Sequence, residues 1–250
     1  MNEVVRLMAR DLAGLGVRRA GTLLVHSSLR SLGSLPGGAE TAVEGLLEAL
    51  GGEGTLLMPA LSYETVGAEN PVFDVLGTRS CVGALPEFFR RMAGVVRSVH
   101  PTHSACATGP RARELLGGHM RDATPCGGNS PFFKLREAAG QILFIGCGLR
   151  PNTSMHAVEE LTEPPYLYGG WVDYRVVLAD GGETAMRVRS HGFKGWRQRY
   201  DRIDAVMGGE GIRSGRVLSA ECFLLEAPAF WLKAHRALKG DPLFFVERIA

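Results

Sequence analysis

Short runs of consecutive apolar residues, separated by a helical segment, constrain the fold of this chain most strongly. GTLLVHSS (21–28) and TLLMPAL (55–61) have the length and the unbroken hydrophobicity of strands buried on both faces. Between them, AETAVEGLLEAL (39–50) places its apolar residues on one helical face, and a third apolar run, QILFIGCGL (141–149), follows later. Buried strands that alternate with helices predict an α/β sandwich whose sheet is covered on both faces.

The other segments fit the same unit. Residues 1–15 have helical spacing, residues 62–80 have little periodicity and are expected to form a long loop, and residues 174–190 resemble a hairpin with a D-G-G turn. The sequence contains no internal repeat, low-complexity segment or clear linker. A single α/β domain over residues 1–250 is therefore expected.

The charge balance argues against two common classes of partner. The 28 Lys and Arg residues against 26 Asp and Glu residues give a formal net charge of +2, which is too small for the basic field of a nucleic-acid or anionic-membrane binder. No apolar segment reaches membrane-spanning length, and the first residues lack the pattern of a signal peptide, so a cytoplasmic protein is expected. Five scattered cysteines without a C-x-x-C pair suit reduced thiols.

The stretch VHSSLRSLGSLPGG (25–38) is the first of three candidates for chemistry. A strand that runs into a small, polar, glycine-containing loop and then a helix presents backbone N–H groups that can bind phosphates. The stretch lacks the motifs of nucleoside-triphosphate and dinucleotide loops, so ATP and NAD are not indicated. An ordinary strand-to-helix connection is the alternative.

The stretch VVRSVHPTHSACATG (95–109) is the second candidate. Its H-x-x-H-x-x-C spacing invites a zinc interpretation, but Pro101 prevents the helix that would bring the two histidines onto one face. Arg97 and Ser98, at the end of an expected strand, have the donors that hold a phosphate through charge-assisted hydrogen bonds. A polar turn without a ligand is the alternative.

The stretch NTSMHAVEE (152–160) is the third candidate. A cap from residues 152–154 starts a helix whose first turn contains His156, and Glu159 and Glu160 then share its face. The positive end of a helix keeps an imidazole neutral, and a carboxylate behind it fixes the tautomer, so a general base is predicted. Spacing alone does not choose between the two glutamates, and a half-buried histidine with an incidental ion pair is the alternative.

Five stretches, taken in order, resemble the aminoglycoside 3-N-acetyltransferase family. The resemblance implies an antibiotic N-acetyltransferase-like α/β fold, a three-layer α/β/α sandwich with a mixed central sheet. It also implies an enzyme that moves an acetyl group from acetyl-CoA to a primary amine, the 3-amino group of an aminoglycoside, and no metal ion is expected. The stretches, which cover residues 1–165 densely, are VHSSLRSLG, GGAETAVEGLLEALGGEGTLLMP, VVRSVHPTHSACATG, GGNSPFFKL and QILFIGCGLRPNTSMHAVEE.

The resemblance also implies roles for individual residues. His156 would act as the general base with Glu159 behind it, and Thr153 or a nearby backbone N–H would stabilise the developing oxyanion during direct transfer, without an acyl-enzyme. Two motifs would bind the cofactor: His26, Ser27, Ser28 and Leu29 would contact the pantetheine and phosphates of CoA, and Arg97, Ser98 and Ser104 would line the same tunnel.

An acceptor with several positive charges calls for acidic neighbours. The candidate substrate-binding residues are Glu64, Asp74 and Glu160. The segment 62–80 is compact beside that of the antibiotic-modifying members, so an acceptor that is not an antibiotic, such as another amino sugar or a small amine, is also considered. A metal-dependent hydrolase and an inactive CoA-binding homologue are the rival functions, and a monomer or homodimer is expected.

Overall fold

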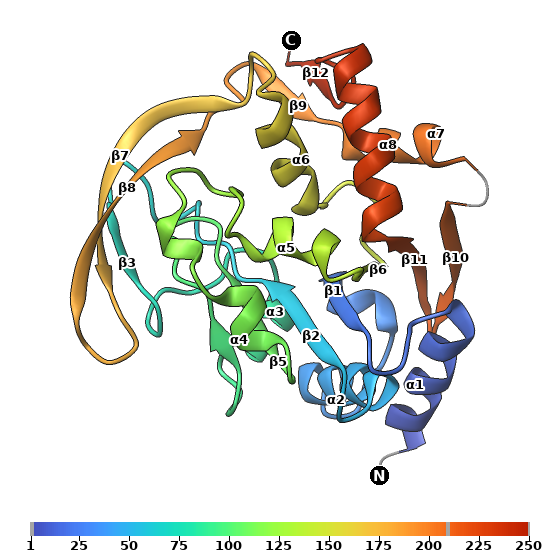
Figure 1. Cartoon of the computed structure of the whole chain (residues 1–250). Coiled ribbons are helices and arrows are strands. Elements are labelled where there is room, and N and C mark those ends of the chain that lie inside the picture. Colours follow the sequence, from blue (N-terminus) through green and yellow to red (C-terminus); the bar gives the residue numbers. More distant parts are fainter. Residues whose placement is uncertain (1–2, 209–210, 250) are drawn as a thin grey trace.

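A mixed seven-stranded sheet forms the centre of the computed structural model, which describes residues 3–208 and 211–249 (Figure 1). The strand order is β10-β11-β6-β1-β2-β5-β4; β6, β1 and β2 are parallel, and the remaining neighbours pair antiparallel. The strands are β1 (Thr22–Ser27), β2 (Thr55–Pro59), β4 (Val96–Arg97), β5 (Ala105–Thr108), β6 (Gln141–Ile145), β10 (Ile212–Val217) and β11 (Ala220–Glu226).

The three middle strands are buried on both faces because their residues alternate between two hydrophobic clusters. In β1, Leu23 and Val25 belong to one cluster and Leu24 belongs to the other. All five residues of β2 and of β6 are buried. The unbroken apolar runs in the sequence correspond to this two-sided burial.

Helices cover both faces of the sheet, so the predicted three-layer α/β/α sandwich with a mixed central sheet is confirmed. The helix α1 (Glu3–Leu15) illustrates how one layer forms, since its buried Val5, Met8, Leu12 and Leu15 recur every three or four residues. One layer contains α1, α2 (Ala39–Leu50) and α3 (Ala84–Arg90); the other contains α4 (Ala112–Leu116), α5 (Pro131–Glu137), α6 (Ser154–Thr162), α7 (Ile203–Met207) and α8 (Ala227–Gly240).

A long hairpin of β7 (Tyr168–Val177) and β8 (Glu183–His191) extends along one side of the sandwich (Figure 1). The expectation of a loop over residues 62–80 is incomplete, because β3 (Val72–Asp74) pairs parallel with β7. Phe73 is fully buried in a small cluster on this second sheet, which explains why three residues without periodicity become a strand.

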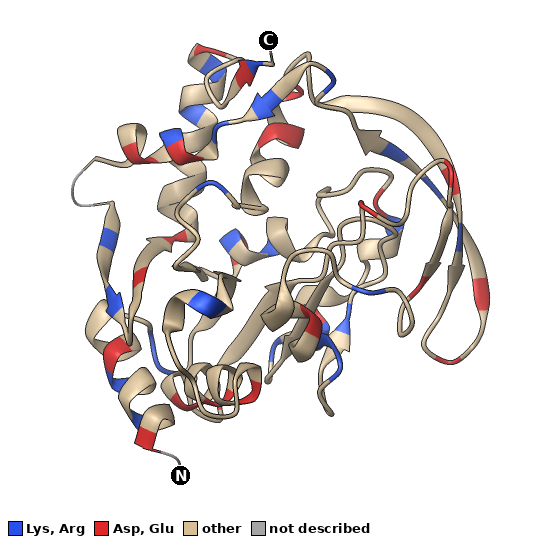
Figure 2. Cartoon of the chain, turned by 180° about the vertical axis from the view of Figure 1, so that it is seen from behind, with Lys and Arg blue, Asp and Glu red and all other residues tan. Residues whose placement is uncertain are grey.

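Short elements complete the described part of the chain. They are the 3₁₀ turns Leu29–Leu32, His119–Arg121 and Tyr200–Arg202 and the strand pair β9 (Trp196–Gln198) and β12 (Val246–Arg248). Basic and acidic residues are interspersed on the outer elements (Figure 2). Within residues 3–208 and 211–249, no helix combines the length and apolarity needed to cross a bilayer.

The turn after β6 brings the strand end against the loop after β1. Gly146 and Gly148 both have positive φ, at 60° and 64°, but their surroundings differ. A Cβ at Gly146 would overlap the side chain of Ser31, whereas a Cβ at Gly148 would meet no atom within 4 Å. This close approach fixes how the chain enters α6.

We predict that Gly146→Ala destabilises the protein much more than Gly148→Ala does. Both variants carry the cost of a left-handed alanine, about 1–2 kcal/mol, but only Gly146→Ala also displaces Ser31. Urea unfolding of both variants measures the difference. Equal losses of unfolding free energy in the two variants would show that Ser31 moves away from the added Cβ without measurable cost.

Candidate active site

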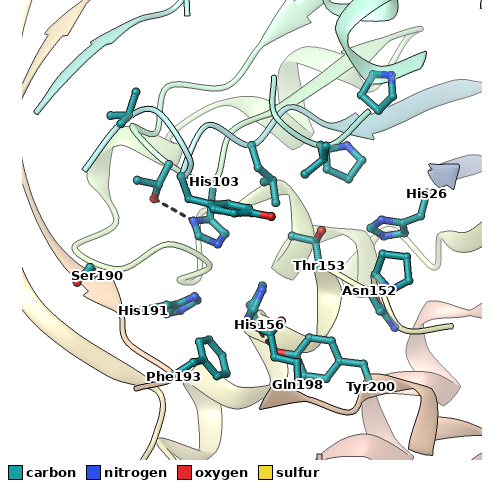
Figure 3. A pocket seen from close by; sticks show the side chains of 18 of the residues that line it. His26, His103, Asn152, Thr153, His156, Ser190, His191, Phe193, Gln198 and Tyr200 are labelled. Atoms are coloured by element: carbon teal, nitrogen blue, oxygen red, sulfur yellow. Dashed lines mark hydrogen bonds between the residues drawn. The ribbon is translucent and has the colours of Figure 1, made fainter. Parts of the chain in front are cut away.

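A pocket of about 620 Å³ lies where the parallel strands of the main sheet end. Its walls come from seven parts of the chain: the end of β1, the loop after β2, residues just before and in α3, the turn before β5, the segment from β6 into α6, strand β7, and residues at and after the end of β8. Figure 3 shows side chains from several of these parts facing one another. Because α/β proteins bind ligands at the carboxyl ends of their parallel strands, this pocket is the candidate active site.

A buried carboxylate, Glu159, organises one wall of the pocket. Glu159 is fully buried, and its Oε1 accepts a hydrogen bond from the Tyr166 hydroxyl at 2.8 Å. Its Oε2 accepts one from the Tyr200 hydroxyl at 2.7 Å and lies 3.3 Å from Nδ1 of His156. The burial of both phenols and the proximity of this carboxylate raise the pKa of each tyrosine, so both stay hydrogen-bond donors.

These contacts assign the tautomer of His156. The single hydrogen of Tyr200 goes to Glu159, so both atoms that face Nδ1 of His156 are acceptors: the Tyr200 oxygen at 3.1 Å and Glu159 Oε2 at 3.3 Å. Nδ1 therefore carries the hydrogen. The Nε2 atom of His156 then carries the lone pair; it has no hydrogen-bond partner among the described side chains, and the ring points into the pocket (Figure 3). A neutral imidazole with an open Nε2 can accept a proton from a bound ligand.

The two glutamates that spacing left equivalent lie in different places. Glu159 lies behind His156, whereas Glu160 accepts hydrogen bonds from the Thr124 hydroxyl and the Cys126 N–H and lies 2.7 Å from Nε2 of His191. Burial raises the pKa of Glu160 to about 7. Its side chain is only 6% exposed, so Glu160 does not face the pocket as the free carboxylate that was expected for substrate binding.

Most histidines of the chain gather around this pocket. The ring of His103 lies 5.4 Å from that of His156 and 5.1 Å from that of His191, and His100 stacks on His119 at 4.8 Å. Burial lowers the pKa of His119 to about 4 and the pKa values of His100, His103 and His191 well below 6.5. These imidazoles are therefore neutral at pH 7.

The H-x-x-H-x-x-C stretch does not gather its three residues around one point. Nδ1 of His100 accepts hydrogen bonds from the N–H groups of Thr102 and His103, and Cys106 lies inside β5, where burial raises its pKa to about 12. Among the described residues, the histidines that do converge are His103, His156 and His191.

Unpaired polar atoms mark the part of the pocket next to β1. His26 Nε2, Ser27 Oγ and Asn152 Nδ2 are buried without a hydrogen-bond partner, and all three residues line the pocket. Buried polar atoms normally have partners, so these three fit a ligand with its own donors and acceptors. Two of the three, His26 and Ser27, are among the predicted cofactor residues, and their contact with acetyl-CoA stays a prediction.

Thr153 lies on the same wall. Its side chain lines the pocket and makes no capping hydrogen bond to α6. The N–H of Ser154 donates to the Asn152 side chain, and the N–H groups of Met155 and His156 donate to backbone oxygens. These three backbone donors are therefore occupied, whereas the Thr153 hydroxyl has no hydrogen-bond partner among the described residues.

The other predicted cofactor residues lie outside the pocket wall. The guanidinium of Arg97 donates to Ser104 Oγ at 2.8 Å and to the carbonyl oxygens of residues 60, 75 and 78, and Ser98 pairs with His119. Ser28 is bonded through its backbone to Ile145 and Ser31, and Leu29 packs against the hydrophobic core. The polar side chains of Arg97, Ser98 and Ser104 are therefore bonded within the protein. Contact of these residues and of Ser28 and Leu29 with CoA stays a prediction.

The acidic residues that were expected to bind substrate are also absent from the wall. Glu64 is exposed next to the pocket residue Tyr63, and Asp74 accepts from the N–H groups of Leu76 and Gly77 in a turn. No Asp or Glu is among the described residues that line the pocket. The hairpin instead contributes Val172 and Tyr174 to the lining, together with the polar Ser190 and His191.

Sequence reasoning missed the residues that the last third of the chain contributes. His191 and Phe193 come from the end of β8, and Tyr200 follows β9. Phe193 packs against His156 with ring centroids 5.6 Å apart. No spacing relates these residues to residues 152–160; the available signal was a histidine and three aromatic residues within the polar stretch 191–200.

We predict that acid destabilises the protein from about pH 6.5 downward. Each histidine that is neutral when folded gains a proton on unfolding, so the free energy of unfolding falls by about 1 kcal/mol per such histidine between pH 6.5 and 5.5. Glu160 has the opposite effect. Its pKa is raised to about 7 in the folded protein, so it loses about one proton on unfolding in this range and offsets the loss of unfolding free energy from one histidine. Urea unfolding at both pH values should show a smaller loss for His119→Gln than for wild type; an equal loss would contradict the neutral state of His119.

Comparisons with known proteins give one consistent result. A family model described as aminoglycoside 3-N-acetyltransferase matches residues 24–239. The chain is 31% identical to aminoglycoside N(3)-acetyltransferase VIII of Streptomyces fradiae over 88% of this chain and 86% of the relative. It is 30% identical to aminoglycoside N(3)-acetyltransferase IX of Micromonospora chalcea over 90% of this chain and 91% of the relative.

Solved structures agree with this result. The apoenzyme of aminoglycoside acetyltransferase AAC(3)-IVa matches with a TM-score of 0.80 and 29% identity, covering 96% of this chain and 90% of that one. A histidine-to-alanine variant of that enzyme in complex with a gentamicin matches at 0.81 and 29%, covering 95% and 89%. The binary complex of AAC-IIIb with CoASH, at 0.82 and 24% identity over 94% and 96%, supports the fold alone.

Proposed function

The chain belongs to the aminoglycoside 3-N-acetyltransferase family, and we propose that it moves an acetyl group from acetyl-CoA to a primary amine with His156 as the general base. The observation that carries this proposal is the free Nε2 of His156, whose Nδ1 faces the buried carboxylate of Glu159 at 3.3 Å. The first candidate acceptor is the 3-amino group of an aminoglycoside, as the names of the relatives suggest.

In the proposed reaction, His156 Nε2 takes a proton from the substrate ammonium. The imidazolium that forms is stabilised by Glu159, because the carboxylate faces its Nδ1–H and is itself held by Tyr166 and Tyr200. The neutral amine then attacks the thioester carbonyl directly. The attacking nitrogen loses two protons in all: His156 passes the first to the departing thiolate, and the second is released to solvent once the carbon–nitrogen bond has formed. The proposal needs no metal ion.

Acetyl-CoA supplies the activated acetyl group, and the chain supplies its binding surface. His26, Ser27 and Asn152 have unpaired polar atoms to offer to it. The Thr153 hydroxyl would donate to the oxygen on which negative charge develops. Arg150, exposed at the pocket lining, is a cation that sequence reasoning did not single out for the phosphates.

A covalent route through a cysteine is disfavoured by electrostatics. Cys147 lines the pocket, but burial raises its pKa to about 11, and the pKa of Cys126 is raised well above 9 by burial and by the carboxylate of Glu160. Both are protonated at pH 7, whereas nucleophilic cysteines are thiolates. Direct transfer to the amine is therefore the proposed route.

The pocket lining favours a second candidate acceptor. An aminoglycoside carries several ammonium groups, yet the described lining has no carboxylate and presents Val66, Val172 and Tyr174. Buried positive charge without a partner is costly. An amine with one positive charge and an apolar body suits this wall better.

We predict that Glu159→Gln and His156→Ala each lower kcat by at least about 10²-fold, within the range that general base catalysis contributes. Glu160→Gln is the matched control: with its pKa raised to about 7, the acid is substantially protonated at pH 7, which Gln imitates, so its effect stays within about tenfold. The activity of all three variants is measured by thiol release from acetyl-CoA, and their affinity for acetyl-CoA is measured by dye binding or calorimetry. An unimpaired His156→Ala variant would end the proposal, and a larger loss in Glu160→Gln than in Glu159→Gln would move the supporting role to the other carboxylate.

We further predict that a small aryl-substituted monoamine has a kcat/KM at least about tenfold above that of gentamicin. The physical reason is the absence of carboxylates from the described lining. The same thiol-release assay, with glucosamine and sisomicin added to the panel, measures this preference. If kcat/KM is instead higher for gentamicin by a similar factor, exposed acidic residues such as Glu64 bind the ammonium groups of the drug, and an aminoglycoside is the acceptor.

A further inference from the structure

Three histidines from distant parts of the chain converge in the pocket. His103 lies in the turn before β5, His156 in the first turn of α6 and His191 at the end of β8. One ring nitrogen from each residue lies within 4.8 Å of the other two. Figure 3 shows the three rings facing a common region.

Each ring has one nitrogen held by the protein and one nitrogen left over. Thr102 Oγ1 contacts Nδ1 of His103 at 2.9 Å, Glu159 contacts Nδ1 of His156 at 3.3 Å, and Glu160 contacts Nε2 of His191 at 2.7 Å. The remaining nitrogens are Nε2 of His103, Nε2 of His156 and Nδ1 of His191. The last is buried without a partner, in a side chain that is only 5% exposed.

This pattern is the one that zinc-binding histidines show. Their second ring nitrogen is normally bonded to a carboxylate or another acceptor, which orients the ring and makes it a better ligand. Two of the three supporting groups here are the carboxyl groups of Glu159 and Glu160.

The spacing of the rings also fits. Three imidazoles that share a tetrahedral ion at about 2.0–2.1 Å from each nitrogen place their ring centroids roughly 5.2 Å apart. The observed centroid distances are 5.4 Å for His103 and His156, 5.1 Å for His103 and His191, and 4.8 Å for His156 and His191. The ligand nitrogens lie within 4.8 Å of one another, against about 3.4 Å around one tetrahedral ion, so metal binding requires the rings to rotate toward one another.

We propose that His103, His156 and His191 bind one Zn²⁺ ion, and that the bound ion inhibits the enzyme by occupying Nε2 of His156. Three imidazole ligands select zinc, copper or nickel over magnesium and calcium. The fourth position of the ion faces the pocket. Metal binding rests on the three rings alone, whereas inhibition also rests on the proposed role of His156 as general base.

Co²⁺ provides a spectroscopic probe for this site. We expect wild-type protein to bind one equivalent of Co²⁺ with the visible absorption of a four-coordinate ion and without thiolate charge transfer, and Zn²⁺ to displace it. His103→Gln and His191→Gln should each weaken binding at least about 30-fold, because each removes one of three ligands.

His235→Gln is the control variant. His235 lies on α8, which contributes none of the three rings, so this variant should bind Co²⁺ as wild type does. Circular dichroism verifies that each variant is folded.

The outcomes separate the two parts of the proposal. Failure of wild-type protein to bind Co²⁺ or Zn²⁺ at millimolar concentration, or unchanged binding in both His103→Gln and His191→Gln, overturns the site. If binding follows the three histidines but stoichiometric Zn²⁺ leaves acetyl transfer by the wild type unaffected, the inhibition is wrong and His156 is not the base. Two results together support both parts. A chelator should reverse the inhibition by Zn²⁺, and His191→Gln should raise the inhibitory Zn²⁺ concentration by the same factor by which it weakens metal binding.

Discussion

The buried carboxylate of Glu159 is the group on which the geometry of the site depends. It has no exposure, and it accepts hydrogen bonds from two tyrosines while facing the imidazole of His156. A buried carboxylate is tolerated only when such donors replace water. The same bonds hold the His156 ring in one orientation and leave its Nε2 toward the pocket, which is what the proposed general base requires.

The fold brings these groups together from elements that are far apart in sequence. The parallel strands β1 and β6 end at one edge of the sheet, where β6 leads through a tight turn into α6. Segments at and after the end of the hairpin then return to this edge and add His191 and Tyr200. The site is therefore formed by distant parts of the chain. The convergence of His191 with His103 and His156, and the contacts of two of these rings with Glu159 and Glu160, are the basis of the proposed zinc site.

Local patterns in the sequence were sufficient for the sandwich and for part of the site. Unbroken apolar runs predicted the central strands, and the polar residues 152–154 predicted the cap of a helix with His156 in its first turn; the cap is Thr153. Spacing could not distinguish Glu159 from Glu160, because adjacent residues on a helix differ only in the tertiary contacts they meet. Strand β3 and the contribution of Tyr200 were missed for the same reason: long-range packing, rather than local periodicity, determines them.

Nitrogen-15 NMR of histidine-labelled protein tests the central claim most directly, because it reports which ring nitrogen of His156 carries the proton. The signal is assigned by its loss in His156→Gln. At a pH of about 7.5, where an ordinary imidazole is neutral, we expect a protonated Nδ1 and an unprotonated Nε2, since Glu159 faces Nδ1. A neutral ring protonated at Nε2 would contradict this account, because the nitrogen facing the pocket would then have no lone pair with which to accept a proton.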